Sequence, residues 1–132
     1  MSLQISIILL NKINTHLIVQ IETNGTCSPG AVTTNVDRLN GVRFVMDWKF
    51  NSPPKSHILE QLGSKDYLKF VISDVMELVE TMHLIGKLHY LNCKVAISAT
   101  DTTLYPLIIE AVKKTNKNVL VNVQIHKFIG VQ

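Results

Sequence analysis

The hydrophobic residues of this chain fall into short runs separated by polar and turn-forming segments, and most of these runs resemble β-strands. They are rich in β-branched and aromatic residues and are only a few residues long. The run over residues 42–48 must end before Pro53 and Pro54, because proline has no amide hydrogen to give to a sheet. The strands predicted in this way are residues 16–22, 42–48, 67–72, 94–98 and 119–125.

Other segments place apolar residues three and four positions apart, a spacing typical of helices that bury one face. The clearest starts after Asp74, which can form a capping box with Glu77. Its expected buried face is Val75, Leu78, Val79, Met82 and Ile85, and we interpret Met76, Leu78, Val79 and Met82 as core rather than as a cofactor-binding stripe. A second such helix has the apolar positions Leu104, Leu107, Ile108, Ala111 and Val112, with Pro106 tolerated in its first turn.

Three further helices are expected from weaker patterns. The chain is predicted to open in a helix, because Ile5, Ile8, Leu9 and Ile13 follow helical spacing. A short helix is expected over residues 57–62, closed by Gly63, and another within residues 27–40, with Val32, Val36 and Leu39 on one face.

Strands that alternate with helices predict right-handed β-α-β units and a parallel sheet covered by helices. The expected fold is therefore α/β, with residues 1–132 in a single domain. Ligands of such sheets bind beyond the carboxyl ends of the strands. The segments expected to share this rim are residues 23–27, 48–54, Ser73, 98–103 and 126–130.

Composition narrows the class of protein. The chain is 46% hydrophobic and 17% charged, which excludes a disordered chain, and its net charge of +3 is too small to indicate nucleic-acid binding. Its apolar runs are too short to span a membrane. Cys27 and Cys93 are its two cysteines, too few for a disulfide framework, so we expect a protein of the reducing cytoplasm.

Several polar residues near the predicted rim are candidates for ligand binding. Lys49 ends a strand, where its ammonium can reach a carboxylate or ribose, or can simply be solvated. Glu22 lies in an apolar strand and needs a partner, which is either a structural hydrogen bond or a ligand. Gln124 and His126 share one face of the last strand and can bind a heterocycle, although a single histidine is often structural. No catalytic triad or glycine-rich phosphate loop can be assigned.

Four segments, taken together and in order, resemble one enzyme family. They are Ile21-Glu22-Thr23-Asn24-Gly25-Thr26, Met46-Asp47-Trp48-Lys49, Leu68-Lys69-Phe70-Val71-Ile72 and Gln124-Ile125-His126-Lys127-Phe128-Ile129-Gly130. The family is that of the 7-carboxy-7-deazaguanine synthases, radical S-adenosylmethionine enzymes of queuosine and 7-deazapurine biosynthesis. The resemblance covers nearly all of this chain but only the C-terminal part of the family's chain.

The resemblance implies a partial parallel β/α barrel, the C-terminal half of a radical S-adenosylmethionine barrel. It implies that S-adenosylmethionine is bound by Glu22, Asn24, Asp47, Trp48, Lys49, Ser98 and Ala99, and substrate by Gln124, His126 and Lys127. Ala99 stands where the family often has a proline after the serine. In the intact enzyme the substrate is 6-carboxy-5,6,7,8-tetrahydropterin, and Mg²⁺ assists a ring contraction that releases ammonia.

The family's cluster-binding motif is missing from this sequence. Members hold a [4Fe-4S] cluster with a Cys-x3-Cys-x2-Cys loop, followed by a Gly-Gly-Glu-Pro motif. Neither motif is present, and Cys27 and Cys93 cannot supply three thiolates. The chain is therefore expected to start after the Gly-Gly-Glu-Pro strand, to be inactive alone, and to need a complementing N-terminal half or a second copy. The alternative is a non-catalytic half-barrel that pairs with another chain through an exposed sheet edge.

Overall fold

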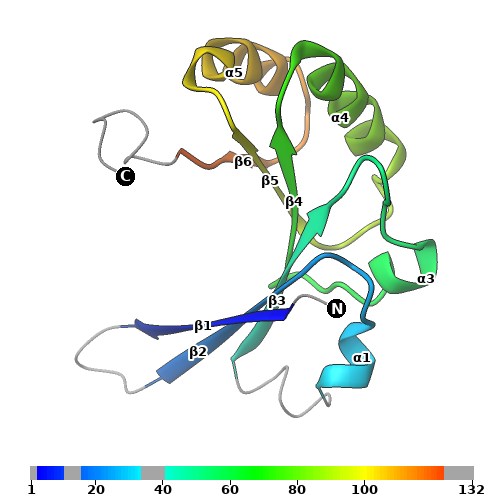
Figure 1. Cartoon of the computed structure of the whole chain (residues 1–132), viewed down its shortest axis with the longest axis vertical. Helices are drawn as coiled ribbons and strands as arrows, with labels where there is room; N and C mark the ends of the chain where they lie inside the picture. The colour runs from blue at the N-terminus through cyan, green and yellow to red at the C-terminus, as the bar shows by residue number, and fades with distance from the viewer. Residues whose placement is uncertain (1–2, 11–15, 34–40, 124–132) are drawn as a thin grey trace.

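The computed structural model describes residues 3–10, 16–33 and 41–123, which form a six-stranded sheet with helices packed against it (Figure 1). The strands follow one another across the sheet in sequence order. They are β1 Leu3–Leu10, β2 His16–Thr23, β3 Val42–Trp48, β4 Tyr67–Ile72, β5 Lys94–Ala99 and β6 Val119–Val121. Strands β2 to β6 pair in parallel, which confirms the predicted α/β fold.

The first element is a strand, so the prediction of an opening helix was wrong. Strand β1 pairs antiparallel with β2 along its whole length, from Leu3 opposite Thr23 to Leu10 opposite His16. The apolar run of this segment is nearly continuous, and a continuous run fits a strand as well as a helix. Pairing with β2 decides between the two, because it satisfies the backbone groups of both strands.

The two faces of the sheet differ in character. In β4, Leu68, Phe70 and Ile72 are fully buried, whereas the alternating residues are only half-buried. The buried set packs with Phe44 and Met46 of β3 into the main hydrophobic core, on the side of the helices. The other face is concave and carries no described helix (Figure 1). Strands β1 and β6 are the two edges, and among the described residues each pairs with one neighbour.

Helix α4, Val75–Lys87, begins as predicted and buries part of the predicted face, with Leu78 and Ile85 in the core. The Asp74 carboxylate accepts a hydrogen bond from the Glu77 amide at 2.8 Å, and the Glu77 carboxylate accepts one from the Ser73 amide at 2.6 Å. The buried residues are Leu78, Thr81 and Ile85. Val75, Val79 and Met76 are 49%, 60% and 75% exposed, so their assignment to the core was wrong. The helix is rotated so that Thr81 rather than Val79 faces the sheet.

The remaining helices are short. Helix α1 is Pro29–Val32, α3 is Ser56–Leu59, and the 3₁₀ turn η1, Thr102–Leu104, leads into α5, Tyr105–Lys113. Pro106 lies in the first turn of α5, as predicted, while Leu107 is 48% exposed. Val36, Leu39 and the end of the predicted last strand lie outside the described residues. No described helix is both long and apolar enough to cross a bilayer.

Candidate functional site

The concave face of the sheet contains a groove of about 240 Å³. It crosses five strands or their ends, and its lining is mixed polar and apolar. The lining residues are Gln20, Glu22, Arg43, Val45, Tyr67, Lys69, Ala96, Leu120 and Asn122. We call this surface the concave groove.

The pairing register explains why these residues meet. Gln20 lies beside Arg43, and Lys69 lies between Asp47 and Ala96 on the neighbouring strands. Ala96 in turn lies beside Leu120. Because strand side chains alternate between the two faces, residues that are level with one another on neighbouring strands share a face. The same alternation that sends Phe44, Leu68 and Phe70 into the core therefore builds the concave groove.

Charged groups of both signs line the concave groove. The Glu22 carboxylate accepts a hydrogen bond from the Gln20 amide nitrogen at 3.2 Å. The Nε atom of Arg43 is buried and has no hydrogen-bond partner among the described residues. Lys69, level with Asp47 and therefore further along the strands than Arg43, adds a second cation to the lining. A buried donor without a partner is costly, so this wall is suited to a ligand that brings hydrogen-bond acceptors.

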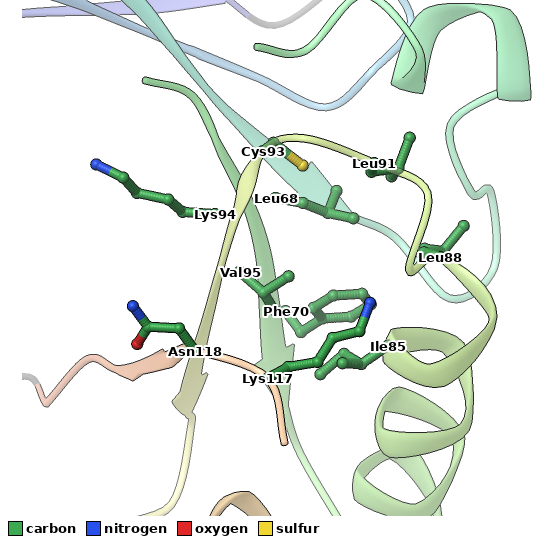
Figure 2. Close-up of a pocket in the computed structure, with 10 residues that line it drawn as sticks. All are labelled: Leu68, Phe70, Ile85, Leu88, Leu91, Cys93, Lys94, Val95, Lys117 and Asn118. Atoms are coloured by element: carbon green, nitrogen blue, oxygen red, sulfur yellow. The ribbon is translucent and has the colours of Figure 1, made fainter. Parts of the chain in front are cut away.

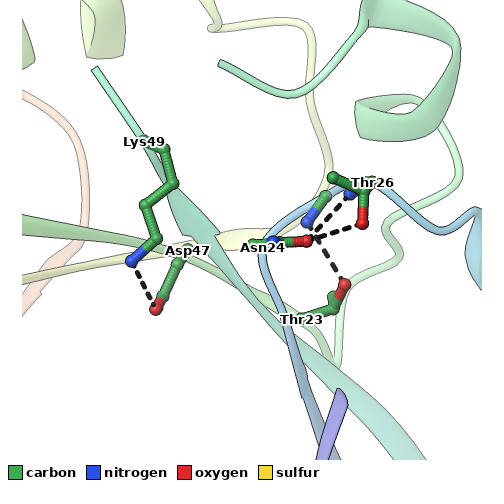
Figure 3. A network of polar contacts seen from close by, with 6 residues as sticks. Thr23, Asn24, Thr26, Asp47 and Lys49 are labelled. Carbon is green, nitrogen blue, oxygen red and sulfur yellow. Dashed lines mark hydrogen bonds and ion pairs between the residues drawn. The ribbon is translucent and has the colours of Figure 1, made fainter. Parts of the chain in front are cut away.

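Two polar networks stand next to each other at the carboxyl ends of β2 and β3 (Figure 3). In the first, the Asn24 side-chain oxygen accepts hydrogen bonds from the Thr26 amide at 3.2 Å and the Thr26 hydroxyl at 2.8 Å. The Thr23 hydroxyl accepts one from the Gly25 amide at 3.2 Å. This is the turn expected from the sequence, and Gly25 adopts a φ of +79° that favours glycine.

The second network is the ion pair between Lys49 and Asp47, whose charged atoms are 3.3 Å apart. Both side chains are substantially exposed, so the pair contributes little to stability. For the same reason, Lys49 can exchange Asp47 for the carboxylate of a ligand at little cost. The structure therefore shows Lys49 as a partly exposed side chain that is paired with Asp47.

The strand alternation divides the residues proposed for S-adenosylmethionine into two groups. Glu22 and Asp47 lie on the concave side, and so does Ser98, which is level with Val71 of β4. The Ser98 hydroxyl is buried without a hydrogen-bond partner among the described residues. In contrast, the Trp48 ring packs on Phe70 with ring centroids 5.6 Å apart, and the Ala99 side chain belongs to the core. Trp48 and Ala99 therefore present only backbone atoms to the concave side.

Some site residues were not found from the sequence, and some cannot be placed. Arg43, Tyr67, Lys69 and Asn122 line the concave groove but were not candidates for ligand binding. The signal that could have identified them is their position: three of them occupy strand positions that alternate with core residues. The substrate candidates Gln124, His126 and Lys127 lie outside the described residues.

The residues described do not fit an iron-sulfur cluster. Cys27 follows the carboxyl end of β2, whereas Cys93 directly precedes the amino end of β5, so the two thiols lie toward opposite ends of the parallel strands. Burial raises the pKa of the Cys93 thiol, which disfavours the thiolate that a metal needs. In the described part of the chain, no three His, Cys, Asp or Glu residues are grouped so as to hold a metal ion.

Comparison with known proteins identifies a relative of this chain. The chain is 29% identical, over 128 aligned residues, to the 7-carboxy-7-deazaguanine synthase of Clostridium acetobutylicum. The aligned region covers 91% of this chain and 57% of the relative, so the chain spans little more than half of the relative's length. No protein-family model and no solved structure matches the chain. The chain is therefore a distant homologue of a 7-carboxy-7-deazaguanine synthase.

Proposed function

We propose that this chain forms the wall that binds S-adenosylmethionine and substrate in an enzyme related to the 7-carboxy-7-deazaguanine synthases, and that it corresponds to their C-terminal part. The observation that carries the proposal is that segments of the resemblance, far apart in the sequence, lie on one side of the sheet. Glu22, Asp47 and Ser98 lie on the concave side, with Asn24 and Lys49 at its rim. The similarity over 91% of the chain supports the same conclusion.

The groups on this surface suit the polar parts of S-adenosylmethionine. The Glu22 carboxylate can accept hydrogen bonds from an amine, and the unpartnered Ser98 hydroxyl can pair with a ribose or purine atom. The Lys49 ammonium can bind the ligand carboxylate once it leaves Asp47. In this enzyme class S-adenosylmethionine supplies the 5'-deoxyadenosyl radical that abstracts hydrogen from 6-carboxy-5,6,7,8-tetrahydropterin.

The substrate is proposed to lie further along the concave side. The Arg43 guanidinium and the Lys69 ammonium there offer donors to an anionic, heterocyclic ligand. We assign Gln124, His126 and Lys127 to the same substrate on the basis of the sequence resemblance. The role of these residues is to bind and orient the pterin. We also propose that the protein is cytoplasmic, because two free cysteines fit a reducing compartment.

The cluster itself must come from outside the described residues of this chain, because its thiols do not fit one. We propose that a complementing N-terminal half supplies it and that this chain alone is inactive. Anaerobic reconstitution with iron and sulfide tests this directly. We expect no stable cluster absorption and no cleavage of S-adenosylmethionine, and either signal from this chain alone would contradict the proposal.

Binding of S-adenosylmethionine to the full chain, measured by titration calorimetry, tests the site. Glu22→Gln removes the charge while keeping the shape, and we expect it to weaken binding about tenfold, in line with the loss of one charge-assisted hydrogen bond. Lys49→Ala should weaken binding as well. Glu60→Gln, an exposed glutamate after α3, is the matched control and should bind like the unaltered chain. No saturable binding, or equal affinities in all variants, would remove the site from this surface.

The open sheet edges favour one other function. In the described residues, β1 and β6 each have a free side, and unpaired strand edges are templates for pairing with another chain. A non-catalytic half-barrel that pairs with a partner or a second copy would use these edges. Sedimentation at micromolar concentration tests this: a monomer that unfolds cooperatively argues against such a module, and a stable dimer argues for it.

A further inference from the structure

A second cavity lies on the helix side of the sheet, near the amino ends of the parallel strands (Figure 2). It also has a volume of about 240 Å³. Its walls come from the end of α4, from the connection between α4 and β5, and from residues just before β6. Because it adjoins Leu68 and Phe70, which point away from the concave groove, it is separate from the proposed S-adenosylmethionine and substrate site.

Most of the cavity wall is apolar. Phe70 and Ile85 form its buried floor, and Leu88, Leu91 and Val95 are only partly buried although they pack against the core. Apolar side chains that line an open space lose the contacts that a close-packed neighbour would give them. An apolar group of matching size would restore these contacts, so the wall is suited to a hydrocarbon.

Two lysines and Asn118 interrupt this mainly apolar wall. The Lys94 ammonium lies over the Tyr67 ring, 5.2 Å from its centroid, which leaves Lys117 as the cation that faces the apolar residues. The Lys117 side chain extends toward α4 alongside Phe70 and Ile85 (Figure 2). Within the described part of the chain, no carboxylate lies within ion-pair distance of its ammonium. The Cys93 thiol, which lines the same cavity, is influenced by the negative charge of Asp66 and, less strongly, by the positive charge of Lys117. A partly buried ammonium without a counter-ion favours an anionic group in this place.

We propose that this cavity binds a small amphipathic carboxylate, whose hydrocarbon lies among Leu88, Leu91 and Val95 and whose carboxylate pairs with Lys117. At ~30 Å³ for each non-hydrogen atom, the volume accepts about eight such atoms. A short-chain or aromatic carboxylate has this size, and hexanoate is a suitable probe.

The reaction rate of the Cys93 thiol, which lines the cavity, can be used to measure binding. The Cys27→Ser variant leaves Cys93 as the one thiol, because the chain has two cysteines. We expect hexanoate to slow the reaction of Cys93 with a neutral maleimide in a saturable manner. Hexanamide, which has the same shape without the charge, should bind about tenfold more weakly, as expected for the loss of one charge-assisted contact. Lys117→Met should bring hexanoate to the level of hexanamide, whereas Lys114→Met, which removes an exposed lysine at the end of α5, should leave protection unchanged.

A second measurement uses the unaltered chain and does not depend on the folding of any variant. The methyl resonances of Leu88 and Leu91 should shift in a saturable manner on addition of hexanoate, in the same concentration range as the protection of Cys93. Absence of both effects up to millimolar hexanoate would overturn the proposal, and so would equal protection by hexanoate and hexanamide. Neither result would bear on binding of S-adenosylmethionine, because that site lies on the other face of the sheet.

Discussion

The Asp66 carboxylate accepts a hydrogen bond from the backbone amide of Phe44 at 2.7 Å, which joins the turn before β4 to the middle of β3. Its other oxygen accepts one from the Gly63 amide at 2.7 Å, and its backbone carbonyl accepts one from the Lys94 amide at 2.9 Å. This fully buried residue therefore fixes the relative position of β3, β4 and β5. These three strands contribute Arg43, Lys69 and Ser98 to the concave side.

Removal of this carboxylate should destabilise the whole chain. Asp66→Ala leaves the Phe44 and Gly63 amides without their acceptor, and hydrogen bonds to a charged group contribute about 1.5–3 kcal/mol each. We expect the free energy of unfolding, measured with urea, to fall by about 3 kcal/mol or more. Lys65→Ala, at an exposed neighbour, should change it by less than about 0.5 kcal/mol. Similar values for the two variants would contradict this role of Asp66.

Replacement of Gly25 by alanine should distort the turn at the carboxyl end of β2. A β-carbon there would lie 2.6 Å from the Pro54 ring, and the φ of +79° is strained for any L-residue. We expect Gly25→Ala to lower the free energy of unfolding by about 2 kcal/mol and to weaken binding of S-adenosylmethionine. In contrast, Gly86→Ala lies in α4 with no atom near the added carbon, and should stabilise the chain by about 0.5–1 kcal/mol. In thermal unfolding, we expect a lower melting temperature for Gly25→Ala and a higher one for Gly86→Ala.

Ser98→Ala should have opposite effects on the stability of the chain and on its affinity for S-adenosylmethionine. The Ser98 hydroxyl is buried and unpartnered among the described residues, so its removal should raise the free energy of unfolding by about 1 kcal/mol. The same change should weaken binding of S-adenosylmethionine if Ser98 contacts it. Thr81→Val removes an equally unpartnered hydroxyl from α4, on the other face of the sheet, and should stabilise the chain without any effect on binding. An unchanged affinity in Ser98→Ala would exclude Ser98 from the site.

The turn before α5 should become less stable in acid. The Asp101 carboxylate accepts hydrogen bonds from the Thr103 amide and hydroxyl, both at 2.9 Å, and these lower the pKa of Asp101. Because the folded state has the lower pKa, the stabilisation is complete above the pKa of an unfolded aspartate. It is lost as the pH falls through the lowered value. Unfolding in urea across the acidic range should show a smaller pH dependence for Asp101→Asn, and parallel curves for the two chains would contradict this.

The sequence predicted the central strands well because their signals are local. The predicted bounds of β3 and β4 agree with the structure, and Asp74 caps α4 as expected. The first strand could not be predicted, because its apolar run is stabilised by pairing with β2, a contact that periodicity does not encode. The buried face of α4 was predicted only in part for a similar reason. Packing against the sheet selected Thr81 and left Val79 exposed.

The candidate site was predictable where it coincides with a turn or a strand end, as at Asn24, Asp47 and Lys49. It was not predictable where it depends on which face of the sheet a residue occupies. Trp48 and Ala99 were assigned to S-adenosylmethionine because of the family resemblance, but the alternation of the strands turns their side chains into the core. Arg43 and Lys69 were overlooked because a charged residue at an alternate strand position is usually only a solvated side chain.

The alternation along β4 has an evolutionary consequence. Leu68, Phe70 and Ile72 keep the domain folded, and the interleaved Tyr67, Lys69 and Val71 face the concave side. A substitution in the second set changes the chemistry of the ligand wall but removes no atom from the close-packed interior. Descendants of this chain can therefore acquire new ligand preferences by single substitutions while the scaffold remains intact.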